Sequence, residues 1–353
     1  MPEELTQSQQ TFYDMLYSRR KAMGAGNRAR SSGKVNAVWL YPYQYERAYA
    51  KGISKIQRDL INYSQGLIFP LLEEREERLD YVEDPADWKT FKTDIADWLD
   101  PEKDIKLTYD EELKQDDSFQ AELKIVLAAI QAEMLRQYGP DSEKVRALIT
   151  ATALGTTKWN DKQAQKFYKG LLGVEFITTE PWEKETIDVW TERNLSLIRG
   201  LSDEYIKNIS GIVADGVLEG ATAKEIEQRL LAEGKKIKGY RARLIARDQV
   251  GKLNGVLTKR RMADAGISMY EWSTAGDERV RARHKPLDNK LCRWDDDTVY
   301  SDDKGVTWKS RSSIGAFAGI PGQDMQCRCT ASPVFQDMVA EVDKQIKEEK
   351  NAA

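Results

Sequence analysis

Apolar residues recur with the helical period over most of this 353-residue chain, and the period changes after Gly266. Residues three and four positions apart lie on one face of an α-helix. Two stripes with this spacing occur early in the chain: Tyr49, Ile53, Ile56, Leu60 and Ile61, then Leu123, Val126, Leu127, Ile130, Met134 and Leu135. Such stripes pack in a core far more often than they line a cofactor site. We therefore expect a mainly helical N-terminal region.

Three further helices are expected between residues 202 and 266. Gly220 is placed to end the first of them, and Thr222 with Glu225 forms a capping box that begins the second, which should stop at Gly234. The third should begin near Tyr240 and end at Gly266. Its expected inner face consists of Leu244, Ile245, Leu253, Val256 and Leu257.

Short strand-like runs follow Gly266, at residues 267–274, 298–300 and 306–308, with turns rich in Asp and Gly between them. This pattern predicts a small α+β domain that ends near Phe335. A last short helix should bury Met338, Val342 and Ile346 on one side. The expected fold class is therefore a mainly α N-terminal region with a small α+β C-terminal domain.

The charge balance limits the possible partners. The chain has 54 Lys and Arg against 58 Asp and Glu, a net charge of −4, so a DNA contact would have to be local. One candidate is residues 19–34, a glycine- and serine-rich stretch without an acidic residue that we expect to be a mobile loop. Its basic residues are Arg19, Arg20, Lys21, Arg28, Arg30 and Lys34. A solvated loop with no partner is the plainer alternative.

No run approaches eighteen apolar residues, so no membrane span is expected. The first residues, MPEELTQSQQ, lack the basic and apolar regions of a secretory signal, which favours a protein made and folded in the cytoplasm. Three cysteines in that compartment should stay reduced.

The single histidine, His284, and all three cysteines, Cys292, Cys327 and Cys329, fall within residues 284–329. Three thiolates and one imidazole match the ligand count of a structural zinc site, and a small turn-rich domain gains most from a metal that staples it. Cys327 and Cys329 form a C-x-C pair, tighter than the usual C-x₂₋₄-C. Asp277 could replace Cys292 as the fourth ligand.

Two alternatives to a metal site remain open. The cysteines could be small buried apolar residues beside a hydrogen-bonded core histidine, or they could form a strained disulfide. A catalytic metal is disfavoured, because zinc deaminases need an H-x-E motif and Lys285 and Pro286 follow His284. With one histidine and no G-x-S-x-G elbow, nucleases of the HNH type and serine hydrolases are also disfavoured. We expect no enzyme activity.

The segments GATAKEIEQRLL, RARLIARDQVGKLNG, WSTAGDERVRARHKPLDNK and PGQDMQCRCTASPVF together resemble the Mu F-like minor head proteins of tailed bacteriophages. They span about a third of the chain, residues 220–334. The segment YPYQYERAYAKGI and the one containing Trp190 and Asn194 resemble the N-terminal part of that family more weakly. By position, the motif residues of the family are Asp277, Arg281, His284, Cys327 and Cys329.

The resemblance implies a non-enzymatic head-morphogenesis protein inside the virion, assembled in the host cytoplasm. Its implied partners are the portal, the major capsid protein and scaffolding proteins, with packaged DNA as a further candidate through residues 19–34. The implied division is a docking region at 1–175, a helical lead-in at 176–266, the His/Cys domain at 267–335 and a tail at 336–353. Some relatives carry a toxin or enzyme domain after this part, whereas here only the tail follows.

Two other functions stay open as alternatives. One is a zinc-stapled cytoplasmic binding module, and the other is a metal-dependent enzyme that acts on nucleic acid.

Overall fold

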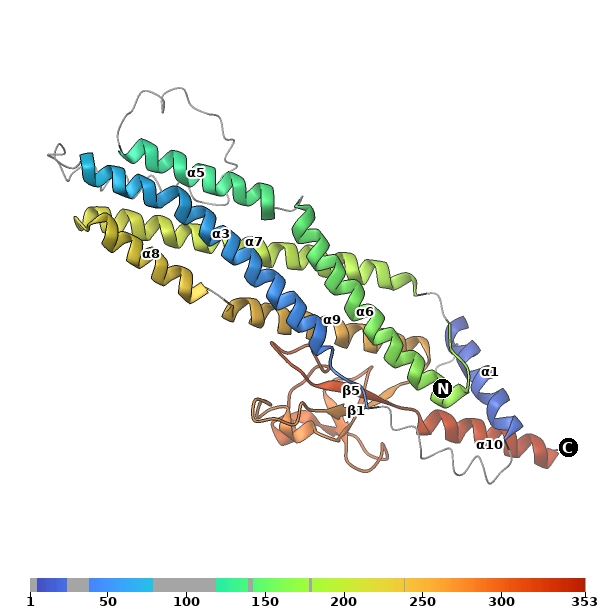
Figure 1. Ribbon diagram of the computed structural model, residues 1–353. Helices are drawn as coiled ribbons and strands as arrows, with labels where there is room; N and C mark the ends of the chain where they lie inside the picture. The colour runs from blue at the N-terminus through green and yellow to red at the C-terminus, as the bar shows by residue number, and fades with distance from the viewer. Residues whose placement is uncertain are drawn as a thin grey trace. The chain divides into compact units, whose positions relative to one another are not determined.

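The computed structural model describes residues 5–23, 38–78, 119–138, 142–177, 180–237 and 239–352. It is mainly helical, with one small antiparallel sheet near the C-terminus (Figure 1). The helices are α1 (Gln7–Ala22), α3 (Tyr43–Arg78), α5 (Phe119–Tyr138), α6 (Glu143–Leu172), α7 (Pro181–Leu218), α8 (Ala223–Ile237), α9 (Tyr240–Asp264) and α10 (Gln336–Ala352). The strands are β1 (Met269–Ser273), β2 (Leu291–Arg293), β3 (Val299–Ser301), β4 (Lys309–Ser310) and β5 (Thr330–Val334). Among the described residues, no helix is long and apolar enough to cross a bilayer.

The chain forms two compact units. Unit 1 contains Met1–Arg47, Ala151–Trp190 and Leu244–Ala353, and unit 2 contains Ala48–Thr150 and Thr191–Arg243. Helices α3, α6, α7 and α9 each have residues in both units.

Unit 2 is a helical core built on the predicted stripes. The α3 stripe is buried throughout, and in α5 Leu127, Ile130 and Met134 are buried whereas Leu135 is exposed. The hydroxyl of Tyr49 donates to the Asn194 side chain at 2.8 Å, so this polar pair is satisfied inside the core.

The junction of α7 and α8 follows the sequence signals. Gly220 adopts a φ of +71°, which ends α7, and the Glu225 N–H donates to the Thr222 hydroxyl as the capping box requires. The predicted stop at Gly234 is wrong, because α8 continues to Ile237. A glycine inside a helix costs only about 1 kcal/mol, and here it lets Ile61 pack closely against the α8 backbone.

Unit 1 joins the two ends of the chain. Helices α1 and α10 lie side by side (Figure 1), and the buried Arg20 guanidinium binds the Asp343 carboxylate through Nε at 2.7 Å and Nη2 at 2.5 Å. The expectation that residues 19–34 form one loop is therefore wrong for Arg19, Arg20 and Lys21, which complete the last turns of α1. Arg28, Arg30 and Lys34 lie outside the described residues.

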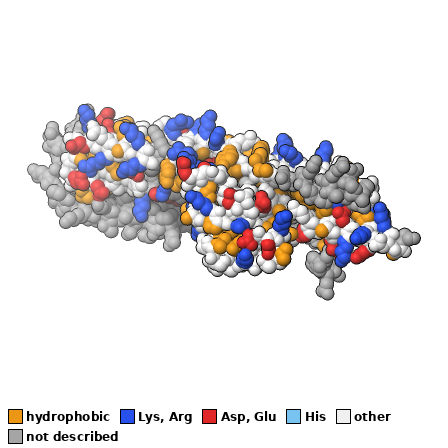
Figure 2. Space-filling model, turned by 90° about the horizontal axis from the view of Figure 1, so that it is seen from below, with side chains coloured by type: hydrophobic (Ala, Val, Ile, Leu, Met, Phe, Trp, Pro, Cys, Tyr) orange, Lys and Arg blue, Asp and Glu red, His pale blue; other side chains and the backbone are white. Residues whose placement is uncertain are grey.

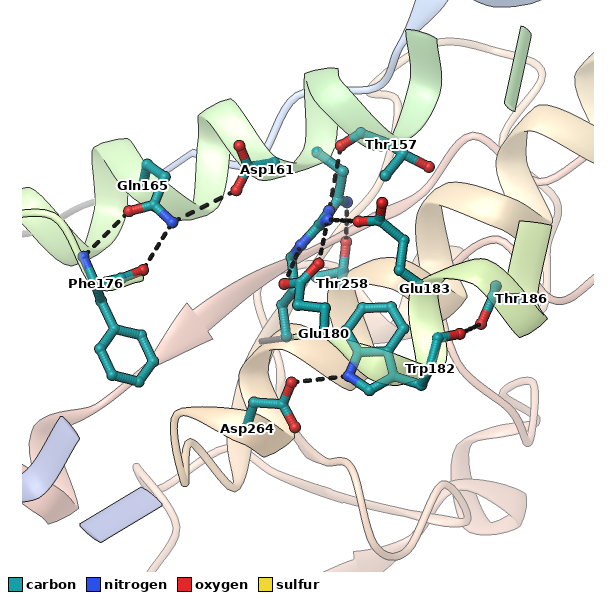
Figure 3. A network of polar contacts seen from close by, with 12 residues as sticks. Thr157, Asp161, Gln165, Phe176, Glu180, Trp182, Glu183, Thr186, Thr258 and Asp264 are labelled. Atoms are coloured by element: carbon teal, nitrogen blue, oxygen red, sulfur yellow. Dashed lines mark hydrogen bonds and ion pairs between the residues drawn. The ribbon is translucent and has the colours of Figure 1, made fainter. Parts of the chain in front are cut away.

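The inner face of α9 is partly polar. Arg261 is 2% exposed, and its Nε and Nη2 donate to the Glu180 carboxylate while Nη2 also reaches Glu183 at 2.9 Å. Its Nη1 donates to the Thr157 carbonyl and to Asn160 Oδ1. Three of these acceptor residues, Thr157, Glu180 and Glu183, lie close together in Figure 3. All five N–H groups of the Arg261 guanidinium are used.

This network explains one error in the expected face of α9. Val256 was expected inside but is 36% exposed, since Asn254, Thr258 and Arg261 take the inner positions and bond to Asn160. The helix ends as expected before Gly266, which has a φ of +71°.

The sheet has the strand order β4-β3-β2-β1-β5, and every neighbouring pair is antiparallel. Strand β1 pairs Tyr270 with Cys292 on one side and with Pro333 on the other. Because β5 is an edge strand, Pro333 can sit there with no loss of a ladder hydrogen bond on its open side.

The strands at 267–274 and 298–300 are confirmed as β1 and β3, whereas the strand at 306–308 is wrong. Val306 is 80% exposed in a turn, and the next strand begins at Lys309. The turn is closed by Asp303, which accepts from the backbone N–H of Thr307 at 2.9 Å and from its hydroxyl at 2.5 Å. Strands β2 and β5 were not expected from the sequence.

Candidate metal centre

Three of the predicted ligands come together in unit 1. His284 precedes the 3-10 turn η3 (Lys285–Leu287), and Cys327 and Cys329 lie just before β5. One donor atom from each of these side chains lies within 4.8 Å of the others. All three side chains are buried, with exposed fractions of 2%, 4% and 6% respectively. This group is therefore a candidate metal centre.

Glycines allow the segment that carries Cys327 and Cys329 to pack closely against the backbone of α9. A methyl group at Gly251 would lie 2.7 Å from the Cys327 carbonyl oxygen, and one at Gly255 would lie 2.3 Å from the Pro321 carbonyl oxygen. Gly322 has a φ of +88°, and a methyl group there would lie 2.3 Å from the Gly251 carbonyl oxygen. Since backbone atoms cannot move aside as side chains do, only glycine permits this approach.

The segment is also fixed by one carboxylate of α9. Asp248 Oδ1 accepts from the backbone N–H of Gln326 at 3.0 Å, where Gln326 has a φ of +55°. The carboxylate thus holds the turn that places Cys327 and Cys329.

The two ring nitrogens of His284 have different partners. Nδ1 lies 3.7 Å from Cys327 Sγ and 3.5 Å from Cys329 Sγ, and Nε2 lies 2.9 Å from Asp324 Oδ2. A neutral imidazole that donates Nε2–H to Asp324 keeps a lone pair on Nδ1, directed at the thiols. A carboxylate behind the outer nitrogen is the usual support of a metal-binding histidine.

Asp324 is itself held in place. Its Oδ2 accepts from Arg281 and its Oδ1 from Arg283, both at 2.6 Å, and the Met325 N–H donates to it as well. Burial raises the pKa of Asp324, but the hydrogen bonds from Arg283 and Arg281 outweigh it and lower the pKa below its usual value. Asp324 therefore remains an ionised acceptor for His284.

The two thiols differ in proton affinity. A hydrogen bond from Cys329, with others from His284 and the Gly322 backbone, lowers the pKa of Cys327 to about 5 despite burial. The pKa of Cys329 is raised by its hydrogen bond to Cys327 and by burial. The pair therefore carries one negative charge near neutral pH, and metal binding would ionise the second thiol.

The structure does not bring Cys292 to this group. Cys292 is fully buried in β2, its Sγ lies 3.7 Å from the Lys290 carbonyl, and burial raises its pKa to about 11. The alternative ligand Asp277 is exposed, and its carboxylate accepts from Arg328 at 2.8 Å. Neither residue belongs to the cluster of donors in this structure.

The separations within the cluster suit a tetrahedral ion. With Zn–N near 2.0 Å and Zn–S near 2.3 Å, a nitrogen and a sulfur on one tetrahedral ion are roughly 3.5 Å apart. The two N···S distances, 3.7 Å and 3.5 Å, are close to that value. His284, Cys327 and Cys329 could therefore hold zinc, whose preferred donors are imidazole and thiolate.

A pocket of about 160 Å³ opens beside the three donors. No carboxylate lines this pocket, but four arginines do. They are Arg247, Arg279, Arg281 and Arg328. Sequence reasoning found Arg281 as a motif residue but missed Asp324 and the other three arginines. The signal for Asp324 was its place within PGQDMQCRC, three residues before Cys327.

Comparison with known proteins identifies the central and C-terminal part of the chain. The model of the family described as phage Mu protein F like protein matches residues 207–332. The minor head protein GP7 of Bacillus phage SPP1 is 26% identical over 148 residues, which are 39% of this chain and 44% of GP7.

Two further relatives have different names. An uncharacterized protein of Haemophilus influenzae is 28% identical over 162 residues, 46% of this chain and 32% of that protein. The NAD(+)-arginine ADP-ribosyltransferase EFV of Enterococcus faecalis is 27% identical over 147 residues, 40% of this chain and 28% of the transferase.

These matches cover less than half the length of each relative, and no solved structure matches the chain. The resemblance inferred from the sequence is confirmed: residues 207–332 match the phage Mu protein F-like family.

Proposed function

We propose that this chain is a minor head protein of a tailed phage, located inside the particle and needed for head assembly. The observation that carries the proposal is the family match over residues 207–332, which the minor head protein of phage SPP1 supports. On the face seen in Figure 2, acidic and basic side chains are interspersed, consistent with a protein that binds defined partners rather than DNA at large.

Within that function, the C-terminal domain is stapled by one zinc ion. His284, Cys327 and Cys329 would supply three ligands, and Asp324 would orient the imidazole. Zinc would contribute folding energy to a sheet whose strands are no longer than five residues. The fourth ligand would be a water molecule in the adjoining pocket or a side chain that reaches it.

An enzyme function is disfavoured by the surroundings of the cluster. Metal-assisted hydrolysis is commonly helped by a side chain that acts as a general base. Asp324, the carboxylate hydrogen-bonded to His284, already accepts from His284, Arg281, Arg283 and the Met325 backbone. The transferase activity in the name of the Enterococcus faecalis relative belongs to that protein, of which this chain matches 28%.

The docking partner in this proposal is the portal or the inner capsid wall, reached through the region 1–175, and a role in DNA delivery would follow from that position. A fragment of residues 1–175 is a poor reagent for testing it. Such a fragment removes α9, α10 and the sheet from unit 1 and separates Arg20 from Asp343. Docking is better tested with the full chain.

A conditional stop codon in the gene tests the proposal. Infection without the protein should yield fewer infectious particles, with empty or defective heads, and supplying the wild-type chain from a plasmid should restore the yield. Normal numbers of DNA-filled, infectious particles in its absence would remove the proposed role. They would also favour the alternative of a free cytoplasmic binding module.

A further inference from the structure

The arginine-lined pocket beside the candidate metal centre has a composition that the zinc proposal does not require. Its wall combines the cluster of donors with Arg247, Arg279, Arg281 and Arg328. A structural metal site needs no arginines at its opening. The pocket therefore calls for a separate explanation.

The arginines of this pocket differ from those that stabilise the fold. Arg261 and Arg311 are buried, and each donates to several acceptors. Arg261 donates to Glu180, Glu183, Asn160 and the Thr157 carbonyl. Arg311 donates to the Tyr270 hydroxyl and to the carbonyls of Val299, Phe317 and Gly319.

By contrast, Arg281 donates from Nη1 to Asp324, and Arg247 donates from Nε to Glu46 at 3.2 Å. The Arg279 guanidinium has no hydrogen bond or ion pair with any described residue. A guanidinium has five N–H donors, so most of the donors in this pocket have no acceptor among the residues that the structure describes.

The carboxylates that hold these arginines also stiffen them. Asp324 fixes Arg281 and Asp277 fixes Arg328, so both guanidinium groups are positioned before any ligand arrives. Preorganised guanidinium groups bind oxyanions in a bidentate manner, at a lower entropic cost than free side chains. The arginines of the pocket are therefore suited to bind an anion.

The size of the pocket limits the anion to one small group. A volume of 160 Å³ is well below the roughly 300 Å³ at which drug-sized ligand sites begin. One phosphate group fits that limit. A nucleic acid backbone presents such groups in series, so that exposed Arg279 at the edge can contact a second phosphate while the pocket holds the first.

We infer that this pocket binds a phosphate group of a nucleic acid backbone. In a chain of net charge −4 the contact is local, and its source would be the packaged DNA, a point that rests on the proposed function. The contact lies in the domain with the His/Cys cluster rather than at residues 19–34.

The chain contains a matched pair of variants for the test. Arg281 and Arg283 both donate to Asp324 at 2.6 Å, but only Arg281 lines the pocket, whereas Arg283 lies over the Phe317 ring. Arg281→Gln and Arg283→Gln therefore lose the same kind of ion pair behind His284. Arg279→Gln removes a pocket arginine that has no ion pair to lose.

Binding of the full-length protein to a fluorescent DNA duplex of mixed sequence is measured by anisotropy over a range of salt concentrations. Each phosphate contact contributes a slope of about −0.9 to the plot of log affinity against log salt. We expect Arg281→Gln and Arg279→Gln each to reduce the slope by about 1 and to weaken binding uniformly across sequences. Arg283→Gln should leave the slope unchanged.

Three results would overturn the inference. In the first, the affinities and slopes of Arg281→Gln, Arg279→Gln and Arg283→Gln are the same as those of the wild type. In the second, polyglutamate binds more tightly than DNA, which would point to a carboxylate from a partner protein. In the third, inorganic phosphate binds while DNA does not. None of these results affects the stop-codon test, so the two proposals can fail independently.

Discussion

His284 illustrates how one residue can be recognised as a ligand candidate by its neighbours. Its Nε2 is hydrogen-bonded to the Asp324 carboxylate, which orients the ring. Its Nδ1 faces the sulfur atoms of Cys327 and Cys329 and can bind a metal ion together with them. The sequence predicted the gathering of His284, Cys327 and Cys329, because rare residue types were concentrated in one segment. It could not predict the separation of Cys292, because which way a short strand turns its side chains depends on its pairing with Tyr270.

The first prediction concerns metal content. Purified protein should contain about one zinc per chain, and Cys327→Ser or Cys329→Ser should remove it and lower the free energy of unfolding by roughly 3 kcal/mol or more. Elemental analysis and urea denaturation measure these effects.

Cys292→Ser is the matched control, a buried cysteine outside the cluster. It should keep the zinc, although placing a hydroxyl in the core will cost some stability. Loss of zinc in this variant would make Cys292 the fourth ligand after all, and a folded wild type without metal would end the zinc proposal.

A second prediction follows from the pKa values of the two thiols. At pH 7, above the pKa of about 5 for Cys327, this thiol is ionised before zinc arrives, whereas Cys329 keeps its proton because its pKa is raised. Zinc binding should therefore release about one proton at pH 7, and affinity should fall as the pH is lowered, because protons compete with zinc for its ligands.

Calorimetry in buffers of different ionisation enthalpy counts the released protons. Release of two protons at pH 7 would mean that both thiols have ordinary values near 8.5 in the folded protein. That result would contradict the charge distribution described for the cluster.

At the scale of elements, the contact between α9 and the cysteine segment determines the site. The sequence predicted α9 and its end at Gly266, since both are local signals. It did not predict the role of Gly251 and Gly255, which depends on a segment some 70 residues further along the chain. Strands β2 and β5 were missed for the same reason, because their short runs become strands only by pairing with β1.

The third prediction tests the close packing of the cysteine segment against the glycines of α9. Gly255→Ala places a methyl group against the Pro321 carbonyl, so the segment that carries Cys327 and Cys329 must shift. We expect weaker zinc binding and a lower melting temperature. Gly211→Ala in α7, where nothing lies within 4 Å, should instead leave zinc binding unchanged and stabilise the chain by up to about 1 kcal/mol. Equal zinc affinity in the two variants would show that packing against Gly255 does not position the cysteines.

The fourth prediction concerns the polar face of α9. Arg261→Met leaves Glu180 and Glu183 without their cation, and the free energy of unfolding should fall by about 2 to 3 kcal/mol, since these carboxylates are only partly exposed. Arg260→Met is the neighbouring control, because its guanidinium lies over the Trp182 ring and forms no ion pair with a described residue. Similar losses in both variants, measured by urea denaturation, would show that the network adds no specific stability.

For the whole molecule, the helical class and the small C-terminal sheet could be predicted from apolar periodicity, because each helix carries its own pattern. The grouping of residues into two units could not, since unit 1 is assembled from three separate stretches of the chain. The pairing of α1 with α10 depends on Arg20 and Asp343, which lie at opposite ends of the sequence. The composition of residues 19–34 predicted a solvated loop, and it therefore gave no sign that Arg20 forms a buried ion pair.

The most direct test of the proposed role is quantitative mass spectrometry of purified particles from the phage or prophage that encodes this chain. If the chain is a minor head protein, its peptides should persist in DNA-filled heads through gradient purification, at a few copies per portal and far below the major capsid protein. Full recovery of the chain in the soluble fraction of the lysate, with none in the particles, would contradict the account.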